Sequence, residues 1–128
     1  MPEQEKITIN ISAVDLGKID LLVQESQYSN RTDFIRTAIR NQLEKHTVEI
    51  QQYVTRHNYG LGAYFYSTSD FEKSKLKGEK IAIKIVGLLH FPTDLTPELA
   101  REVVDSIEVR GIFHASDDVK AALADRMM

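Results

Sequence analysis

Apolar and polar residues alternate strictly over residues 6–11, near the start of the chain. In an extended backbone, this pattern puts three isoleucines on one face and three polar side chains on the other. The apolar set is Ile7, Ile9 and Ile11, and the polar set is Lys6, Thr8 and Asn10. A lone strand with one apolar face is not stable in water. We therefore expect this strand to pair with the same strand of a second copy, forming a two-stranded ribbon.

Two helices are predicted after the strand. Ser12 and Asp15 form a start signal, because the serine hydroxyl can accept from a first-turn amide and the acid suits the positive end of the helix. Apolar residues then recur at helical spacing, which predicts a first helix over 13–26. A second start signal, Asn30-x-x-Asp33, precedes a helix with one apolar face made of Phe34, Ile35, Ala38, Ile39 and Leu43.

The helical pattern continues beyond residue 46. No glycine or proline interrupts residues 31–59, and apolar or ring-bearing residues follow a heptad spacing from Ile39 to His57. This spacing predicts that the second helix runs on as a rod to about residue 56. The alternative is a break near Thr47-Val48, followed by a separate helix over 48–57. Gly60 and Gly62 then mark a turn or hinge.

The second half of the chain contains an internal repeat. Residues 63–66 are a short aromatic strand candidate, and the polar residues 67–80 are predicted to be a solvated loop. Residues 84–100 and 109–124 then match each other at an offset of 24, with Gly87 aligned to Gly111 and His90 to His114. Each unit reads as a strand through a glycine followed by a short capped helix. One such unit cannot bury its apolar face alone, so we expect pairing between units or between chains.

Composition narrows the possible chemistry. The 128 residues include no cysteine, which excludes disulfides, thiolate zinc sites and thiol nucleophiles. We find no phosphate loop, zinc-protease motif or nucleophile elbow, so we expect no enzyme activity, no cofactor and no metal site. A ligand pair made of His90 and His114 is the alternative. No apolar run approaches the ~18 residues of a membrane span, and the start lacks a signal-peptide pattern, so we expect a cytoplasmic protein.

The first third of the chain resembles a known family. The segment Lys-Ile-Thr-Ile-Asn-Ile, followed at the right distance by Tyr-Ser-Asn-Arg-Thr-Asp-Phe-Ile-Arg, is similar to the ribbon-helix-helix superfamily of MetJ, Arc and CopG-type bacterial regulators. The resemblance covers roughly residues 5–46. It implies base contacts from the outward side chains of the ribbon and phosphate contacts from the start of the second helix. The implied base contacts are Lys6, Thr8 and Asn10, and the implied phosphate contacts are Ser29, Asn30, Arg31 and Thr32.

The implied side chains suit this role chemically. Lysine can donate to guanine, asparagine can pair with adenine, and threonine can hydrogen-bond or touch a thymine methyl. Amides at a helix start, together with the helix dipole, bind anions. The net charge of −3 gives no global basic field, so any DNA contact must be local.

We therefore expect an α+β fold of three parts. Residues 1–46 are predicted to be a ribbon-helix-helix DNA-binding and dimerisation domain, 47–60 a helical linker, and 61–128 a small α/β domain with two strand–helix repeats for oligomerisation or effector binding. The expected function is a sequence-specific transcriptional repressor that binds double-stranded DNA as a homodimer, with tetramers through the C-terminal half as a further state. The alternative is an antitoxin-like protein whose C-terminal half binds a partner protein. A nickel-sensing domain is not supported, because the chain lacks the His-x-His pair and the cysteine that such a site uses.

Overall fold

The computed structural model describes residues 4–128, which fall into two compact units. We call Lys6–Tyr53 the N-terminal unit and Val54–Met128 the C-terminal unit. The division lies inside a helix, α3 (Thr47–His57), whereas the sequence pattern predicts domain limits at residues 46 and 60.

The N-terminal unit contains the two expected helices, α1 (Ala13–Gln24) and α2 (Arg31–Lys45). Both start signals are confirmed. The Asp15 amide donates to the Ser12 hydroxyl over 3.1 Å, and the Asp33 amide donates to the Asn30 side-chain oxygen over 2.8 Å. Residues 4–12 form neither helix nor strand in the single chain. The expected ribbon, which needs a second copy, therefore stays a prediction.

The predicted rod is wrong, and the alternative of a break is correct. Helix α2 ends at Lys45, His46 leaves the helical conformation with ψ of 15°, and α3 starts at Thr47. The physical reason is local hydrogen bonding by polar side chains at the break, of which the threonine bond to a backbone carbonyl competes directly with helix continuation. The Thr47 hydroxyl donates to the Glu44 carbonyl over 2.9 Å, and the His46 ring lies 3.0 Å from the Glu49 carboxylate.

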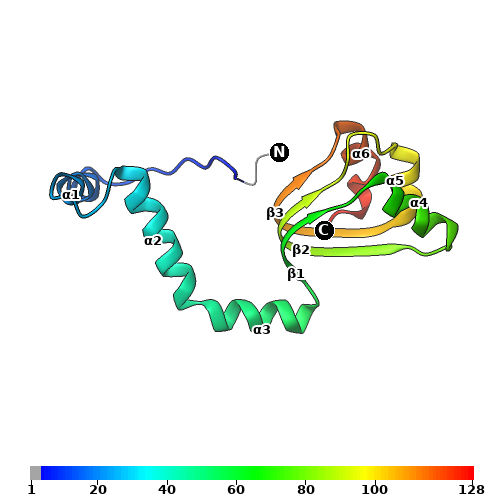
Figure 1. Cartoon of the computed structure of the whole chain (residues 1–128), viewed down its shortest axis with the longest axis horizontal. Coiled ribbons are helices and arrows are strands. Elements are labelled where there is room, and N and C mark those ends of the chain that lie inside the picture. The colour runs from blue at the N-terminus through cyan, green and yellow to red at the C-terminus, as the bar shows by residue number, and fades with distance from the viewer. Residues whose placement is uncertain (1–3) are drawn as a thin grey trace. The chain divides into compact units, whose positions relative to one another are not determined.

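The C-terminal unit is a three-stranded parallel sheet in the order β1-β2-β3, with the helices α4, α5 and α6 on one of its faces (Figure 1). The elements alternate along the chain, and a short 3₁₀ turn over Ala124–Arg126 follows the last helix. They are β1 (Gly60–Phe65), α4 (Thr68–Leu76), β2 (Ile81–His90), α5 (Pro97–Val103), β3 (Val104–His114) and α6 (Asp117–Ala122).

The expected loop over 67–80 is wrong, because this segment contains α4. Ser67 and Asp70 form a capping box: the Asp70 carboxylate accepts from the Ser67 amide at 2.8 Å, and the Ser67 hydroxyl accepts from the Asp70 amide at 3.3 Å. The next residue, Phe71, is completely buried. The C-terminal unit therefore contains three strand–helix repeats, one more than the two predicted from the sequence.

The core of the C-terminal unit lies between the sheet and its helices. It is a continuous apolar cluster, and side chains of β2 and β3 meet side chains of all three helices in it. Its members are Phe71, Ile83, Ile85, Leu89, Phe91, Leu95, Ala100, Val103, Val104, Ile107, Val119 and Leu123. No helix of residues 54–128 covers the opposite face, which carries Leu61 and Phe65, each about half exposed.

Candidate nucleic-acid interface

The three side chains expected to contact bases are all exposed. Lys6, Thr8 and Asn10 lie in the segment that precedes α1, and solvent reaches each of them. The alternating isoleucines of this segment are exposed as well: Ile7 by 73%, Ile9 by 63% and Ile11 by 43%. The segment thus presents an apolar row with nothing covering it.

The helices of the N-terminal unit also leave apolar side chains uncovered. From Lys6 to Tyr53, Ile19 is the one buried hydrophobic residue, at 8% exposure. Large apolar residues that stay exposed on the helices are Val14, Leu21, Ile39, Leu43, Val48 and Tyr53. A unit of this size cannot be stable with one buried apolar side chain, because burial of apolar surface is the main driving force of folding.

The helices α1 and α2 are joined by an ion pair that the sequence pattern did not predict. The Arg31 guanidinium donates to both carboxylate oxygens of Asp20, over 2.7 and 2.8 Å. This bidentate contact lowers the pKa of Asp20 below its ordinary value and raises the pKa of Arg31. The signal in the sequence was an acid on α1 and an arginine at the start of α2. Arg31 therefore links the two helices with its side chain.

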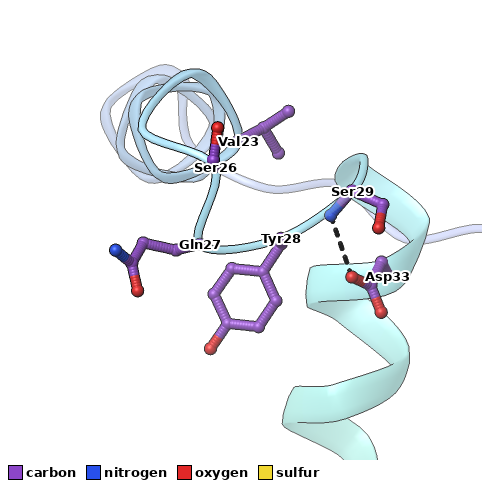
Figure 2. A pocket seen from close by; sticks show the side chains of 6 residues that line it. All are labelled: Val23, Ser26, Gln27, Tyr28, Ser29 and Asp33. Carbon is purple, nitrogen blue, oxygen red and sulfur yellow. Dashed lines mark hydrogen bonds between the residues drawn. The ribbon is translucent and has the colours of Figure 1, made fainter.

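The start of α2 brings the four expected phosphate contacts together. Ser29 and Asn30 precede the helix, and Arg31 and Thr32 are its first two residues. First-turn amides have no acceptor inside their own helix, so those of Arg31 and Thr32 suit an anion. The Ser29 amide differs, because it donates to the Asp33 carboxylate over 2.9 Å (Figure 2). Of the four residues, Ser29 is thus already engaged through its backbone.

A shallow pocket of about 340 Å³ lies beside this helix start. Figure 2 shows the Tyr28 ring and the Asp33 carboxylate among its lining side chains, which are Val23, Ser26, Gln27, Tyr28, Ser29 and Asp33. A carboxylate in the lining repels phosphate. The pocket itself therefore does not suit an anion.

Within residues 4–128, no three histidine or acidic residues come together to hold a metal ion. The rings of His90 and His114 lie on adjacent strands, with their centroids 6.5 Å apart. None of the helices described here is long and apolar enough to cross a membrane.

Comparison with known proteins agrees with this geometry. The model of the Ribbon-Helix-Helix transcriptional regulator family matches residues 2–120, which include the C-terminal sheet as well as the two N-terminal helices. No curated protein and no solved structure matched the chain. Because the match spans most of its length, the chain belongs to the ribbon-helix-helix transcriptional regulators, a family of DNA-binding proteins that are not enzymes.

Proposed function

We propose that this regulator is a homodimer that reads the DNA major groove with a two-stranded ribbon. The observation that supports it most strongly is the uncovered apolar surface of the N-terminal unit. Ile7, Ile9 and Ile11 are exposed in the single chain, and strand pairing between two copies places all six on the inner face of the dimer. The same pairing places Lys6, Thr8 and Asn10 of both copies on the outer face.

The outer face of this ribbon makes the base contacts. The major groove is wide enough for a two-stranded ribbon, and it shows a distinct donor and acceptor pattern for each base pair. Asn10 pairs with adenine, Lys6 donates to guanine, and Thr8 contacts a base edge or a thymine methyl. Each bidentate pair contributes roughly 1–3 kcal/mol of discrimination between bases.

The start of α2 holds the DNA backbone beside the ribbon. The first-turn amides of Arg31 and Thr32, together with Asn30, receive one phosphate at the positive end of the helix dipole. The amide of Ser29 joins them when the Asp33 carboxylate turns away from it. Such contacts fix the register of the protein on the duplex and carry no sequence information.

Repression follows from occupancy of an operator by more than one dimer. Association through the C-terminal units joins dimers on adjacent half-sites and increases affinity through effective concentration. The same unit bears on the antitoxin-like alternative. A partner-wrapping tail is typically polar and disordered, whereas residues 54–128 form a sheet with a continuous apolar core.

Selection from a random duplex-DNA pool tests this function. Wild type should enrich a repeated half-site, at a stated salt concentration because affinity depends on it. Asn10→Ala should lose preference at one base position of each half-site while the protein stays dimeric. The matched control is Asn41→Ala, which removes the same side chain from an exposed position on α2.

Two results would count against the proposal. Unchanged preference in Asn10→Ala would exclude the base contact of Asn10. No enrichment by a folded and dimeric wild type would exclude autonomous sequence reading altogether.

A further inference from the structure

Three glycines form a row across the sheet of the C-terminal unit. Gly62 of β1 lies opposite Gly87 of β2, and Gly87 lies opposite Gly111 of β3. All three have positive φ angles, at 138°, 136° and 127°. Side-chain-bearing residues rarely adopt this conformation, so the backbone bends in the same way at the same level of each strand.

For two of these glycines, the neighbouring strand explains the missing side chain. A Cβ atom on Gly87 would lie 2.1 Å from the carbonyl oxygen of Gly62, and a Cβ atom on Gly111 would lie 2.1 Å from the carbonyl oxygen of Gly87. Each glycine thus leaves room for the carbonyl of the strand before it. At Gly62 the same space is open, with nothing within 4 Å of the corresponding position.

The β3 edge of the sheet carries a carbonyl, that of Gly111, which would fit the open space beside Gly62. The carbonyl of Gly62 is directed at β2, and that of Gly87 is directed at β3. Gly111 has the same register and nearly the same φ, so its carbonyl is directed at the outer side of β3. Four residues earlier on that side, the Ile107 carbonyl already accepts from the Met128 amide over 2.9 Å.

Strand β1 also lacks the features that protect edge strands. Such strands are usually shielded by charged residues or proline against pairing with another chain. The sequence of β1, Gly-Leu-Gly-Ala-Tyr-Phe, contains neither. Five of its six residues are exposed, including Leu61 at 50% and Phe65 at 54%.

We propose that β1 is the docking site for β3 of a second copy of this chain. The two strands run parallel with Gly111 opposite Gly62, so that the Gly111 carbonyl enters the open space and the row of glycines continues across the interface. The register places Ile112 of one copy beside Ala63 of the other. Pairing of β1 with β1 is disfavoured, because it brings the open spaces at Gly62 of the two copies together. Neither space would then receive a Gly111 carbonyl.

The contact is heterologous, since it joins two different edges. When each copy provides β3 to one neighbour and accepts at β1 from another, both edges of every sheet are paired, in a closed ring or an open row of copies. This association gives the C-terminal contact proposed above a specific surface, and it does not depend on DNA.

Site-specific cross-linking tests the register. The chain has no cysteine, so introduced thiols are unique. Full-length chains carrying Ala63→Cys and Ile112→Cys are co-expressed with different tags, purified through both tags, and treated with a short bis-maleimide. We expect the Ala63→Cys chain to be linked to the Ile112→Cys chain. The matched control pairs Ala63→Cys with Ala82→Cys and should give no product. Ala82 is an exposed alanine at the start of β2, far from the residue of β2 that lies opposite Ala63.

Two outcomes would overturn the proposal. Linkage of Ala63→Cys chains to one another would show that β1 pairs with itself. No product in the Ala63→Cys and Ile112→Cys mixture would show that the two edges do not meet.

Hydrogen exchange on the unmodified protein gives a readout that needs no variant. The Tyr66 amide donates to the His90 carbonyl of β2 over 3.0 Å, so strand alternation directs the amides of Ala63 and Phe65 to the outer side of β1. Pairing with a second copy should slow their exchange by roughly tenfold or more relative to an open edge. Free exchange of both amides at concentrations where the protein is oligomeric would contradict the pairing.

Discussion

The two units of this protein bury apolar residues to very different extents. The C-terminal unit has a twelve-residue cluster in which Phe71, Leu89 and Leu123 are completely inaccessible, whereas the N-terminal unit buries Ile19 alone. Both units contain amphipathic elements with well-formed helix caps. The difference teaches that good local structure does not imply a self-sufficient fold. The C-terminal unit has a core within one chain, whereas in the proposed dimer the N-terminal unit would form its core by joining the apolar faces of two chains.

Removal of a large core side chain should give the largest loss of unfolding free energy, and this loss should be confined to the C-terminal unit. Phe71→Ala deletes a fully buried ring, which costs about 3–5 kcal/mol of unfolding free energy. Denaturant unfolding followed by circular dichroism measures the loss. The matched control is Leu76→Ala on the same helix, where the side chain is 86% exposed and the change should stay within about 0.5 kcal/mol. Equal effects of the two substitutions would contradict the assigned core.

In the N-terminal unit, the effect of removing an apolar side chain should depend on protein concentration, because it should weaken the association of two copies. Ile9→Ala removes apolar surface that we expect to be buried between two copies, with a loss of about 1.5–3 kcal/mol per chain. Sedimentation across a dilution series should show weaker dimers. Thr8→Ala, on the opposite face of the same segment, should leave the dimer intact and alter base preference. An Ile9→Ala protein with unchanged association would place the dimer interface elsewhere.

Two helix-cap substitutions, one in each unit, should cost the same stability and differ in their effect on DNA binding. Asn30→Ala and Ser67→Ala each remove a side chain that caps a helix start, and each should lower stability by about 1 kcal/mol. Binding to duplex DNA should separate them. Asn30→Ala should weaken affinity for all sequences alike, because it alters the proposed phosphate contact, and Ser67→Ala should not. Gel-shift titration on specific and random duplexes provides the measurement, and equal affinities in both variants would remove Asn30 from the DNA interface.

Acid should weaken an ion pair in each unit, with the smallest effect of the series. Arg31 lowers the pKa of Asp20, and Arg101 lowers the pKa of Asp125, each mainly through a hydrogen bond. A carboxyl whose folded pKa lies below its ordinary value of 3.8 stabilises the fold above that value. This contribution is lost as the pH falls through the lower, folded pKa. Melting temperatures measured from neutral pH to about pH 2 should therefore drop less in Asp20→Asn and Asp125→Asn than in wild type. Parallel curves would show that these exposed pairs contribute nothing.

The features that the sequence predicted correctly depend on short-range chemistry. Both N-terminal helix starts follow from a capping side chain and an acid three residues later, and the strand–glycine–helix units around Gly87 and Gly111 follow from repetition. Neither inference needs to know what lies across the fold. The same holds for the alternation over residues 6–11, which predicts a partner without identifying where it binds.

The features that the sequence analysis missed depend on contacts between distant residues or on competing local bonds. Helix α4 lies in a charged segment with few apolar residues, and the importance of Phe71 appears only where its ring meets Phe91 across the core. The first repeat was hidden because Phe65 stands where the other two units have His90 and His114. The break near His46 was predicted only as the alternative to a continuous rod, because no glycine or proline marks it. Likewise, the pair between Arg31 and Asp20 joins residues eleven positions apart.

The row of glycines has a consequence for how this sheet can evolve. Gly87 and Gly111 each leave room for the carbonyl of the strand before them, and Gly62 and Gly87 each direct a carbonyl at the strand after them, so the three strands have similar edges at this level. Duplication of one strand–helix unit therefore yields a segment that fits beside its parent without redesign. A single inserted residue shifts one glycine out of line and places a side chain against a backbone carbonyl. Gene lengthening in this half of the protein is consequently favoured in whole units of about two dozen residues.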